Sequence, residues 1–215
     1  MDTEVFRAWI VSAADVIEAN RDHLTQLDAA IGDADHGFNL ARGFAAVTAA
    51  LEGEAAGAAG VRPATPGALL TLTGSTLISK VGGASGPLYG VAFRRAGKAL
   101  GGTPDIDLPT LEAALEAALA GVQQLGAARE GDKTMVDALA PATRAFGKAI
   151  ADGASAADAL SALATAAAAG AAATVSMQAR KGRASYLGPR SVGHEDPGAA
   201  STALLLAALR DVVAR

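Results

Sequence analysis

The sequence predicts an all-α fold made of eight helices, and three observations lead to this prediction. Of the 215 residues, 51% are hydrophobic but only 4% are aromatic, and much of the difference is alanine, the strongest helix former. Apolar residues recur at helical spacing between Gly-rich breaks, and no stretch shows the alternating Val, Ile and Thr pattern of a strand. A chain of this length can bury a large core, so we expect one domain over residues 1–215.

The predicted helices follow one another along the chain with short connections. In the opening helix, which begins after Thr3, the residues Phe6, Ile10, Ala13 and Ile17 lie on one face. The other seven helices are predicted at residues 36–56, 66–81, 86–100, 109–129, 134–151, 156–179 and 197–213.

Glycine and proline mark the breaks between these helices. Gly82-Gly83 and Gly101-Gly102 end the third and fourth helices, and Pro109 suits the first turn of the fifth. Pro141, inside the sixth helix, is expected to kink it or to sit at a junction. Only residues 52–68 have the composition of a long loop.

Composition excludes several classes of function. The net charge of −4 gives no general attraction to nucleic acid or to an anionic membrane. Cysteine is absent, which excludes disulfides and thiolate metal sites and fits a reducing cytoplasm. The N-terminal segment lacks the basic start of a signal peptide, and the most apolar run, 162–175, is alanine-rich and short for a membrane span. We therefore expect a soluble, cytoplasmic protein with neither nucleic acid nor membrane as a partner.

An acidic segment before the second predicted helix contains three carboxylates, at Asp28, Asp33 and Asp35. In a regular helix the last two would point to roughly opposite sides, so they converge only on an irregular backbone, which Gly32 and Gly37 permit. Converging carboxylates repel one another unless a cation lies between them. Oxygen ligands without cysteine favour Mg²⁺, Mn²⁺ or Ca²⁺ over Zn²⁺.

Two alternatives apply to this acidic segment. An EF-hand counted from Asp33 would need Gly and Glu where Phe38 and Phe44 stand, so Mg²⁺ with phosphate oxygens fits better. In the simpler alternative, Asp35 only caps the next helix while Asp28 and Asp33 are solvated turn residues.

The Gly-rich segment 82–86 can bind an anion, because backbone N–H groups at a helix start are unpaired and favoured by the helix dipole. Ser85 adds a hydroxyl group, although Gly-Gly is also an ordinary helix end. The segment is not a Walker A loop, since that motif occurs nowhere in the chain.

Residues 131–135 form another short break. Lys133 can meet phosphate and Met135 can pack on a purine, but a turn capped by Asp132 or Thr134, with Met135 in the core, accounts for the same residues.

A basic segment precedes the last helix, and Asp196 is its natural N-cap. One arginine can bind two phosphate oxygens at once, so this segment is either a phosphate-binding site or an ordinary basic surface loop. Its cations are Arg180, Lys181, Arg183 and Arg190. His36 and His194 are candidate acids, bases or phosphate donors, whereas His23 has no supporting context.

The four polar segments all lie at helix junctions, and alternate junctions of an up-and-down bundle lie at the same end. We therefore expect them to form one site. Carboxylates for Mg²⁺, backbone N–H groups and arginines for phosphates are what phosphoryl transfer requires. Together they indicate a nucleotide-dependent phosphotransferase without a P-loop.

Four ordered motifs resemble the L subunit of dihydroxyacetone kinase, and the resemblance covers nearly the whole chain. They are the segments IGDADHGFN at 31–39, GGASGPLYG at 82–90, GDKTMVDAL at 131–139 and RKGRASYLGPRSVGHEDPGA at 180–199. The resemblance implies an eight-helix antiparallel up-and-down barrel with the nucleotide and Mg²⁺ at one end.

The resemblance also implies roles for individual residues. Asp28, Asp33 and Asp35 would coordinate Mg²⁺, as two ions, and would act in catalysis together with Arg183. The ADP or ATP contacts implied are His36, Gly37, Phe38, Asn39, Gly83, Ala84, Ser85, Gly126, Thr134, Met135, Arg183, Asp196, Pro197 and Gly198.

The family has two modes of action, and Asp35-His36-Gly37 resembles its separate bacterial subunits. This implies that ADP stays bound and is rephosphorylated from phosphoenolpyruvate by an M-type protein of the phosphotransferase system. The acceptor, dihydroxyacetone, would be held by a separate K subunit, since this chain has no room for a K domain. The alternatives are an ATP-dependent kinase subunit for a tetrose or an acyl acceptor, and a non-enzymatic nucleotide-binding regulator.

Overall fold

The structure is a computed structural model that describes residues 1–55 and 63–214. Throughout these residues the regular structure is helical and no strand occurs. The helices are α1 (Thr3–Ala19), α2 (Arg21–Ile31), α3 (His36–Ala55), α4 (Pro66–Lys80), α5 (Ser85–Leu100), α6 (Leu108–Gly126), α7 (Val136–Ala151), α8 (Ala156–Ala173) and α9 (Pro197–Val213), with the 3₁₀ segments η1 (Thr174–Ser176) and η2 (Arg183–Ser191) between the last two.

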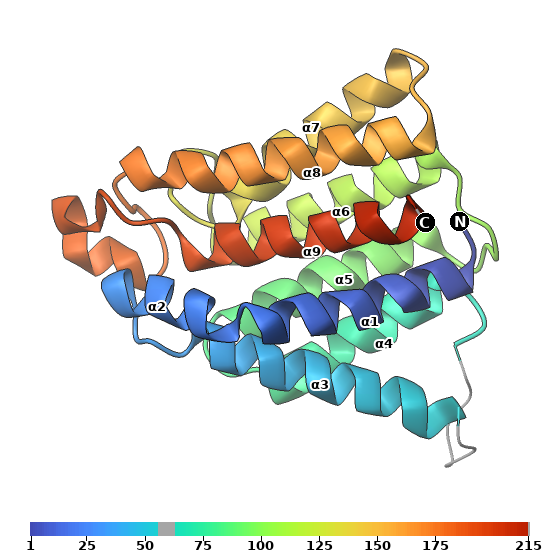
Figure 1. Cartoon of the computed structure of the whole chain (residues 1–215), viewed down its shortest axis with the longest axis horizontal. Helices are drawn as coiled ribbons and strands as arrows, with labels where there is room; N and C mark the ends of the chain where they lie inside the picture. The colour runs from blue at the N-terminus through green and yellow to red at the C-terminus, as the bar shows by residue number, and fades with distance from the viewer. Residues whose placement is uncertain (56–62, 215) are drawn as a thin grey trace.

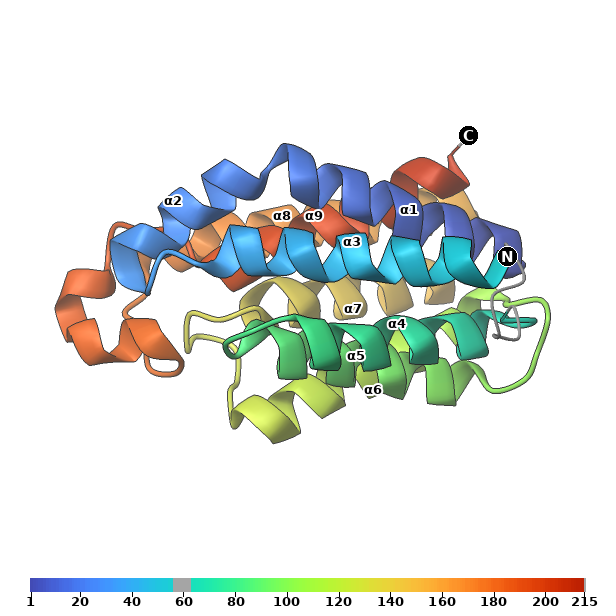
Figure 2. The ribbon, with the colours of Figure 1, turned by 90° about the horizontal axis from the view of Figure 1, so that it is seen from below.

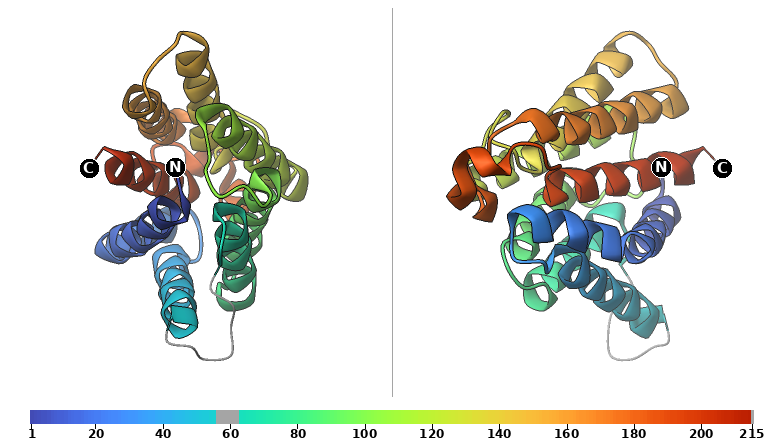
Figure 3. Two further views of the ribbon diagram at one scale, coloured as in Figure 1. Left: turned by 90° about the vertical axis from the view of Figure 1, so that its right-hand side faces the viewer. Right: turned by 60° about the vertical axis from the view of Figure 1, so that its left-hand side comes forward.

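Eight of these helices close into a ring. Going round it, α1 packs on α3, then each helix packs on the next through α4, α5, α6, α7 and α8 to α9, which returns to α1. Successive helices run in opposite directions, and the view along the axis shows them arranged around a centre (Figures 1, 2 and 3). The predicted eight-helix antiparallel barrel is therefore confirmed.

The additional helix, α2, was not predicted as a separate element. The backbone turns at Asn20, whose side-chain amide donates to the carbonyl oxygen of Val16 at 2.8 Å, and α2 then continues beyond the end of α1 (Figure 2). Its buried face consists of Leu24, Asp28 and Ile31, spaced at helical intervals. This helix brings Asp28 to the end of the barrel.

Some predicted boundaries differ from the structure by a few residues. The helix predicted at 156–179 ends at Ala173, where the chain tightens into η1, and α7 continues through Pro141 to Ala151, so no junction lies at the proline. The helix predicted at 109–129 ends at Gly126 because Ala127 adopts a left-handed conformation (φ 46°). Of the predicted loop 52–68, α3 and α4 take up both ends, and residues 56–62 lie outside the described residues.

The barrel interior is one apolar cluster with few aromatic rings. Trp9 lies between Phe6 and Phe93, with ring centroids 6.0 and 5.7 Å away, and its indole N–H donates to the carbonyl oxygen of Leu205 at 2.9 Å. This hydrogen bond joins α1 to α9, the first and last helices of the ring, so it helps to close the barrel.

Glycines let α4 and α5 approach closely, as the small side chains of the sequence predict. A Cβ atom on Gly74 would lie 2.5 Å from the carbonyl oxygen of Gly90, and one on Gly97 would lie 2.5 Å from that of Gly67. Real Cβ atoms essentially never come that close. The backbones of α4 and α5 therefore touch directly at these positions.

One helix, Ala156–Ser176, is long and apolar enough to cross a membrane by length and composition alone, with a mean hydropathy of 1.5. The sequence-based expectation considered only residues 162–175 and took them as too short. In the structure one face of α8, including Leu160 and Leu163, packs in the core. Core helices of soluble proteins pass the same test, so this helix is only a weak indication of a membrane.

Candidate functional site

A pocket lies at the end of the barrel where the four polar junctions meet, at the left in Figure 1. The convergence inferred from alternate junctions is therefore what the structure shows. The predicted site residues among its walls are Asp28, Asp33, Asp35, His36, Gly83, Ala84, Ser85, Thr134, Met135, Arg183, Asp196, Pro197 and Gly198.

Three carboxylates form a cluster on one side of this pocket. Asp28, Asp33 and Asp35 each offer an oxygen atom, and these atoms all lie within 4.8 Å of one another. The backbone between them is irregular, with Ala34 in the left-handed region (φ 62°). Gly32 is required here, because a Cβ atom on it would lie 2.0 Å from a carboxylate oxygen of Asp28. The donor set fits Mg²⁺, which takes carboxylate oxygens together with phosphate oxygens.

Asp28 also holds the acidic segment in shape. Its Oδ2 atom accepts hydrogen bonds from the backbone N–H groups of Asp35 at 2.9 Å and His36 at 3.1 Å. Asp28 is buried, so it is not the solvated turn residue of the simpler alternative, and it rather than the Asp35 side chain caps α3.

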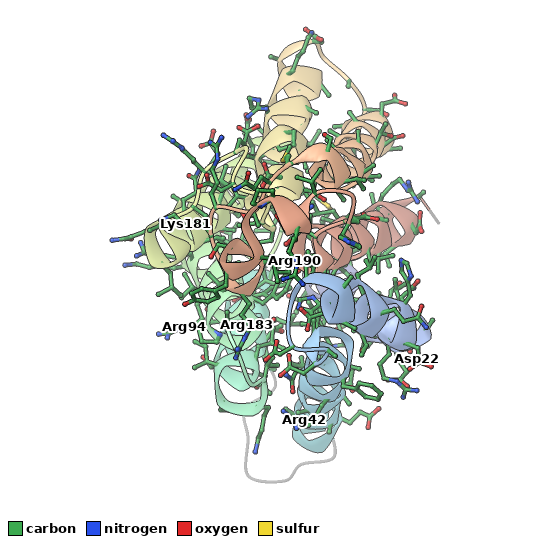
Figure 4. The ribbon with its side chains drawn as sticks, turned by 90° about the vertical axis from the view of Figure 1, so that its left-hand side faces the viewer. Asp22, Arg42, Arg94, Lys181, Arg183 and Arg190 are labelled. Atoms are coloured by element: carbon green, nitrogen blue, oxygen red, sulfur yellow. The ribbon has the colours of Figure 1, made fainter. Side chains whose placement is uncertain are left out.

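Arg183 crosses the pocket to the acidic cluster. Its guanidinium lies 3.1 Å from Oδ2 of Asp33. Figure 4 looks onto this end of the barrel and shows Arg183 with Lys181 and Arg190 from the same segment, and with Arg42 and Arg94 from α3 and α5. Of these cations, Lys181 and Arg183 line the pocket that holds the acidic cluster, where they can meet phosphate oxygens.

His36 has both ring nitrogens engaged. Nδ1 lies 3.0 Å from the hydroxyl of Ser85, and Nε2 lies 2.9 Å from the hydroxyl of Ser201. Burial lowers the pKa of His36 below its ordinary value, and the nearby Asp28 and Asp35 only partly oppose this. A ring held on both sides positions Ser85 at the pocket wall.

Sequence reasoning missed a buried hydroxyl cluster behind His36. The Tyr89 hydroxyl lies 2.7 Å from that of Ser201 and 2.9 Å from that of Thr202, and burial raises the pKa of Tyr89 to about 12. Tyr89 belongs to the motif GGASGPLYG at 82–90, but Ser201 and Thr202 look like ordinary helix residues. Only the packing of α5 on α9 reveals them.

The Gly-rich segment provides unpaired backbone N–H groups. Gly83 is left-handed (φ 67°), and Ala84 precedes α5 without any side-chain hydrogen bond to the first turn. Both residues and Ser85 line the pocket. The start of α5 therefore faces the carboxylates with its positive end, the arrangement that suits phosphate.

The segment 131–135 is held by a residue that sequence reasoning did not select. The Asp137 carboxylate accepts from the backbone N–H groups of Thr134, at 2.8 Å, and Gly131. The predicted cap by Thr134 is present beside it, because the Thr134 hydroxyl accepts from the backbone N–H of Val136, the first residue of α7, at 3.2 Å. The Asp132 carboxylate accepts from the backbone N–H of Arg129 instead. Lys133, the candidate phosphate contact, lines the pocket, but its amine donates to the main-chain carbonyl oxygens of Thr174 and His194.

An apolar pocket continues from the first one. The two pockets share Thr134 and Met135, and Gly126 lies in the second pocket only. The second has a volume of about 290 Å³, and its apolar walls include Leu88, Val122 and Leu125. It can take a flat base while the first takes the phosphates.

Three predicted nucleotide contacts lie outside the pocket walls. The ring of Phe38 is 53% exposed and lies 5.1 Å from the guanidinium carbon of Arg21, and Asn39 accepts from Arg42. Gly37 serves packing instead, because a Cβ atom on it would lie 2.0 Å from the carbonyl oxygen of Arg21.

Asp196 caps the last helix as predicted, accepting from the backbone N–H of Ala199 at 2.7 Å. Burial raises the pKa of Asp196 from 3.8 to about 7, although Lys133 and the cap oppose the shift. The folded chain therefore binds a proton here that the unfolded chain releases.

This shift predicts a pH dependence of stability. Between pH 4 and pH 7 the folded state holds the extra proton, so the contribution of Asp196 should fall as pH rises, by roughly 2–4 kcal/mol. Asp196→Asn keeps an oxygen for the cap but cannot titrate. Chemical unfolding at pH 5 and pH 8 should show a smaller stability difference in the variant than in the parent, and equal differences would contradict the prediction.

Comparison with known proteins gives a family. Residues 30–211 match the family model described as the DAK2 domain. The chain is 40% identical over 198 residues to the PEP-dependent dihydroxyacetone kinase, ADP-binding subunit DhaL, of Escherichia coli, covering 92% of this chain and 91% of that protein. It is 39% identical over 206 residues to the PTS-dependent dihydroxyacetone kinase, ADP-binding subunit DhaL, of Lactococcus lactis, covering 96% of this chain and 95% of that protein.

Solved structures have the same fold. The crystal structure of the dihydroxyacetone kinase of C. freundii matches with a TM-score of 0.71 and 26% identity, covering 98% of this chain and 34% of that one. Its complex with AMP-PNP and Mg²⁺ matches with a TM-score of 0.69, at 26% identity and with the same coverage. The family model matches most of the chain, and both relatives align with more than nine-tenths of it. This chain therefore belongs to the family of dihydroxyacetone kinase L subunits.

Proposed function

We propose that this chain is the nucleotide-binding subunit of a dihydroxyacetone kinase and that its pocket holds ADP or ATP with Mg²⁺. One observation carries the proposal: three carboxylates whose oxygens lie within 4.8 Å of one another share a pocket with the uncapped start of α5. Two relatives support it: one is an ADP-binding subunit by name, and the other is a solved structure in complex with AMP-PNP and Mg²⁺.

Each part of the pocket has a proposed task. Asp28, Asp33 and Asp35 hold two Mg²⁺ ions, which when bound neutralise the phosphate charge that otherwise resists transfer. The backbone N–H groups around Ser85 bind phosphate oxygens, and the neighbouring apolar pocket receives the adenine. Arg183, which pairs with Asp33 at 3.1 Å, would stabilise the charge of the phosphoryl group at the same place.

The acceptor and the phosphoryl donor lie on other proteins in this proposal. Relatives named as ADP-binding subunits of dihydroxyacetone kinase support a separate K subunit that presents dihydroxyacetone. The relatives named as dependent on phosphoenolpyruvate or the phosphotransferase system favour a retained ADP, rephosphorylated by an M-type protein of that system in the cytoplasm.

Native mass spectrometry of the purified chain tests the retained cofactor. We expect ADP to survive gel filtration and to be converted to ATP only when a phosphoenolpyruvate-fed donor protein is added. Phosphorylation of dihydroxyacetone should then require the K subunit as well. A chain that turns over dihydroxyacetone without any second subunit would refute the divided site.

A second candidate is an ATP-consuming kinase subunit with another acceptor. The triokinase/FMN cyclase of Rattus norvegicus is 35% identical over 192 residues, which is 89% of this chain but 32% of that protein. In this case ATP would exchange freely, and the purified pocket would be found without tightly held ADP.

A further inference from the structure

Lys133 is buried in a place where a lysine is costly. Its side chain is 1% exposed, and it is the only buried lysine or arginine in residues 1–53 and 63–214. Its backbone is left-handed (φ 61°), a conformation that glycine adopts more easily. A lysine that is both strained and buried indicates a specific use of its amine.

The amine binds two points that lie far apart in sequence. It donates to the main-chain carbonyl oxygens of Thr174, at 2.6 Å, and His194. These residues stand at the two ends of the segment 174–194, which joins α8 to α9. One cation in the 131–135 turn therefore holds both ends of that segment.

The middle of this segment forms one wall of the nucleotide pocket, through residues that include Lys181 and Arg183. Further bonds follow the same route: the backbone N–H of Arg180 donates to the carbonyl oxygen of Asp132 at 3.0 Å, and that of Gly193 to Val175 at 2.8 Å. The turn next to Thr134 and Met135 is thus tied to the wall that carries Arg183.

We propose that Lys133 is a positioning residue that sets how long the nucleotide stays bound, by holding the 174–194 segment over the pocket rather than by contacting phosphate. This rests on the proposed function, because it supplies the slow release that a retained ADP needs. The amine donates to a carbonyl oxygen at each end of the segment, so its loss removes the hydrogen bonds that join both ends to the 131–135 turn and loosens the wall.

The test compares Lys133→Met with Lys181→Met in the full chain. Both variants lose one positive charge at the same pocket, but Lys181 is exposed and lies on the segment itself. Amide hydrogen exchange of residues 177–195 is measured without nucleotide, and the dissociation of labelled ADP is measured with Mg²⁺. In Lys133→Met, both the exchange and the ADP dissociation rate should rise about tenfold or more. In Lys181→Met the exchange should stay unchanged.

Three results would overturn the proposal: unchanged exchange in Lys133→Met, faster exchange with unchanged ADP dissociation, or the same exchange in both variants. If Lys133→Met does not fold, Lys133→Gln decides instead, because its amide can still donate a hydrogen bond but its side chain is one atom too short to keep both carbonyl contacts. Faster exchange and ADP release support the proposal, and parental values contradict it. If the unmodified chain binds no ADP, the proposed function is refuted. The exchange comparison would still show whether Lys133 holds the 174–194 segment.

Discussion

Asp33→Asn is expected to reduce kinase turnover by about a thousandfold, measured with the K subunit and the phosphoryl donor present. The substitution keeps the shape of the side chain but removes one of three charges that face the metal. Asp33 is exposed and makes no cap, so the fold should be unaffected. Half-saturation by Mg²⁺ should move to higher concentration, and adding Mg²⁺ should recover only part of the turnover.

Asp22→Asn is the matched control. Asp22 lies on α2, is exposed and pairs with Arg21 at 3.0 Å, as Asp33 pairs with Arg183, but it stands outside the pocket (Figure 4). Its replacement should leave turnover and the Mg²⁺ dependence unchanged. If Asp33→Asn shows the same Mg²⁺ dependence as the unmodified chain, Asp33 is not a metal ligand.

Gly74→Ala is expected to destabilise the fold by about 2–4 kcal/mol, because the added methyl group meets the carbonyl oxygen of Gly90 at 2.5 Å. Backbone atoms cannot move aside as a flexible side chain can, so α4 and α5 must separate. The melting temperature should fall by roughly 5–15 °C. Since α5 starts at the pocket, nucleotide affinity should fall as well.

Gly53→Ala is the control for this prediction. Gly53 is also in a helix, but a Cβ atom there would meet nothing within 4 Å. Alanine at this position should stabilise the chain by about 0.5–1 kcal/mol, because it is the better helix former. Thermal unfolding of both variants checks the pair, and equal shifts would mean that close helix contact does not explain Gly74.

The regular helices were predictable because their cause is local. Stripes such as the one containing Phe6 and Ile10, and the breaks at Gly82 and Gly101, depend on residues only a few positions apart. The short helix α2 was missed because its position depends on a contact with residues that are not its neighbours in sequence. Its buried face includes Asp28, which reads as a surface residue until the cap of α3 is seen.

The candidate site was predictable where polar residues gather at junctions, and less so where a side chain's direction matters. Lys133 was a candidate phosphate contact, yet its amine binds carbonyl groups inside the fold. Phe38 and Asn39 follow the acidic segment directly but are not among the residues that line the pocket. A helix turns about 100° per residue, so neighbours in sequence point to different surroundings.

By itself the sequence determined the helical fold, the positions of its breaks and the kinds of atoms available at one end of the barrel. These properties come from helix propensity, periodicity and the chemistry of single residues. Only the tertiary structure decided that Asp28 caps α3 while belonging to the carboxylate cluster, that His36 joins Ser85 to Ser201, and that the Lys133 amine binds the carbonyl oxygen of Thr174. Each of these contacts joins residues that are separate along the chain, and closing the eight-helix ring is what brings them within bonding distance.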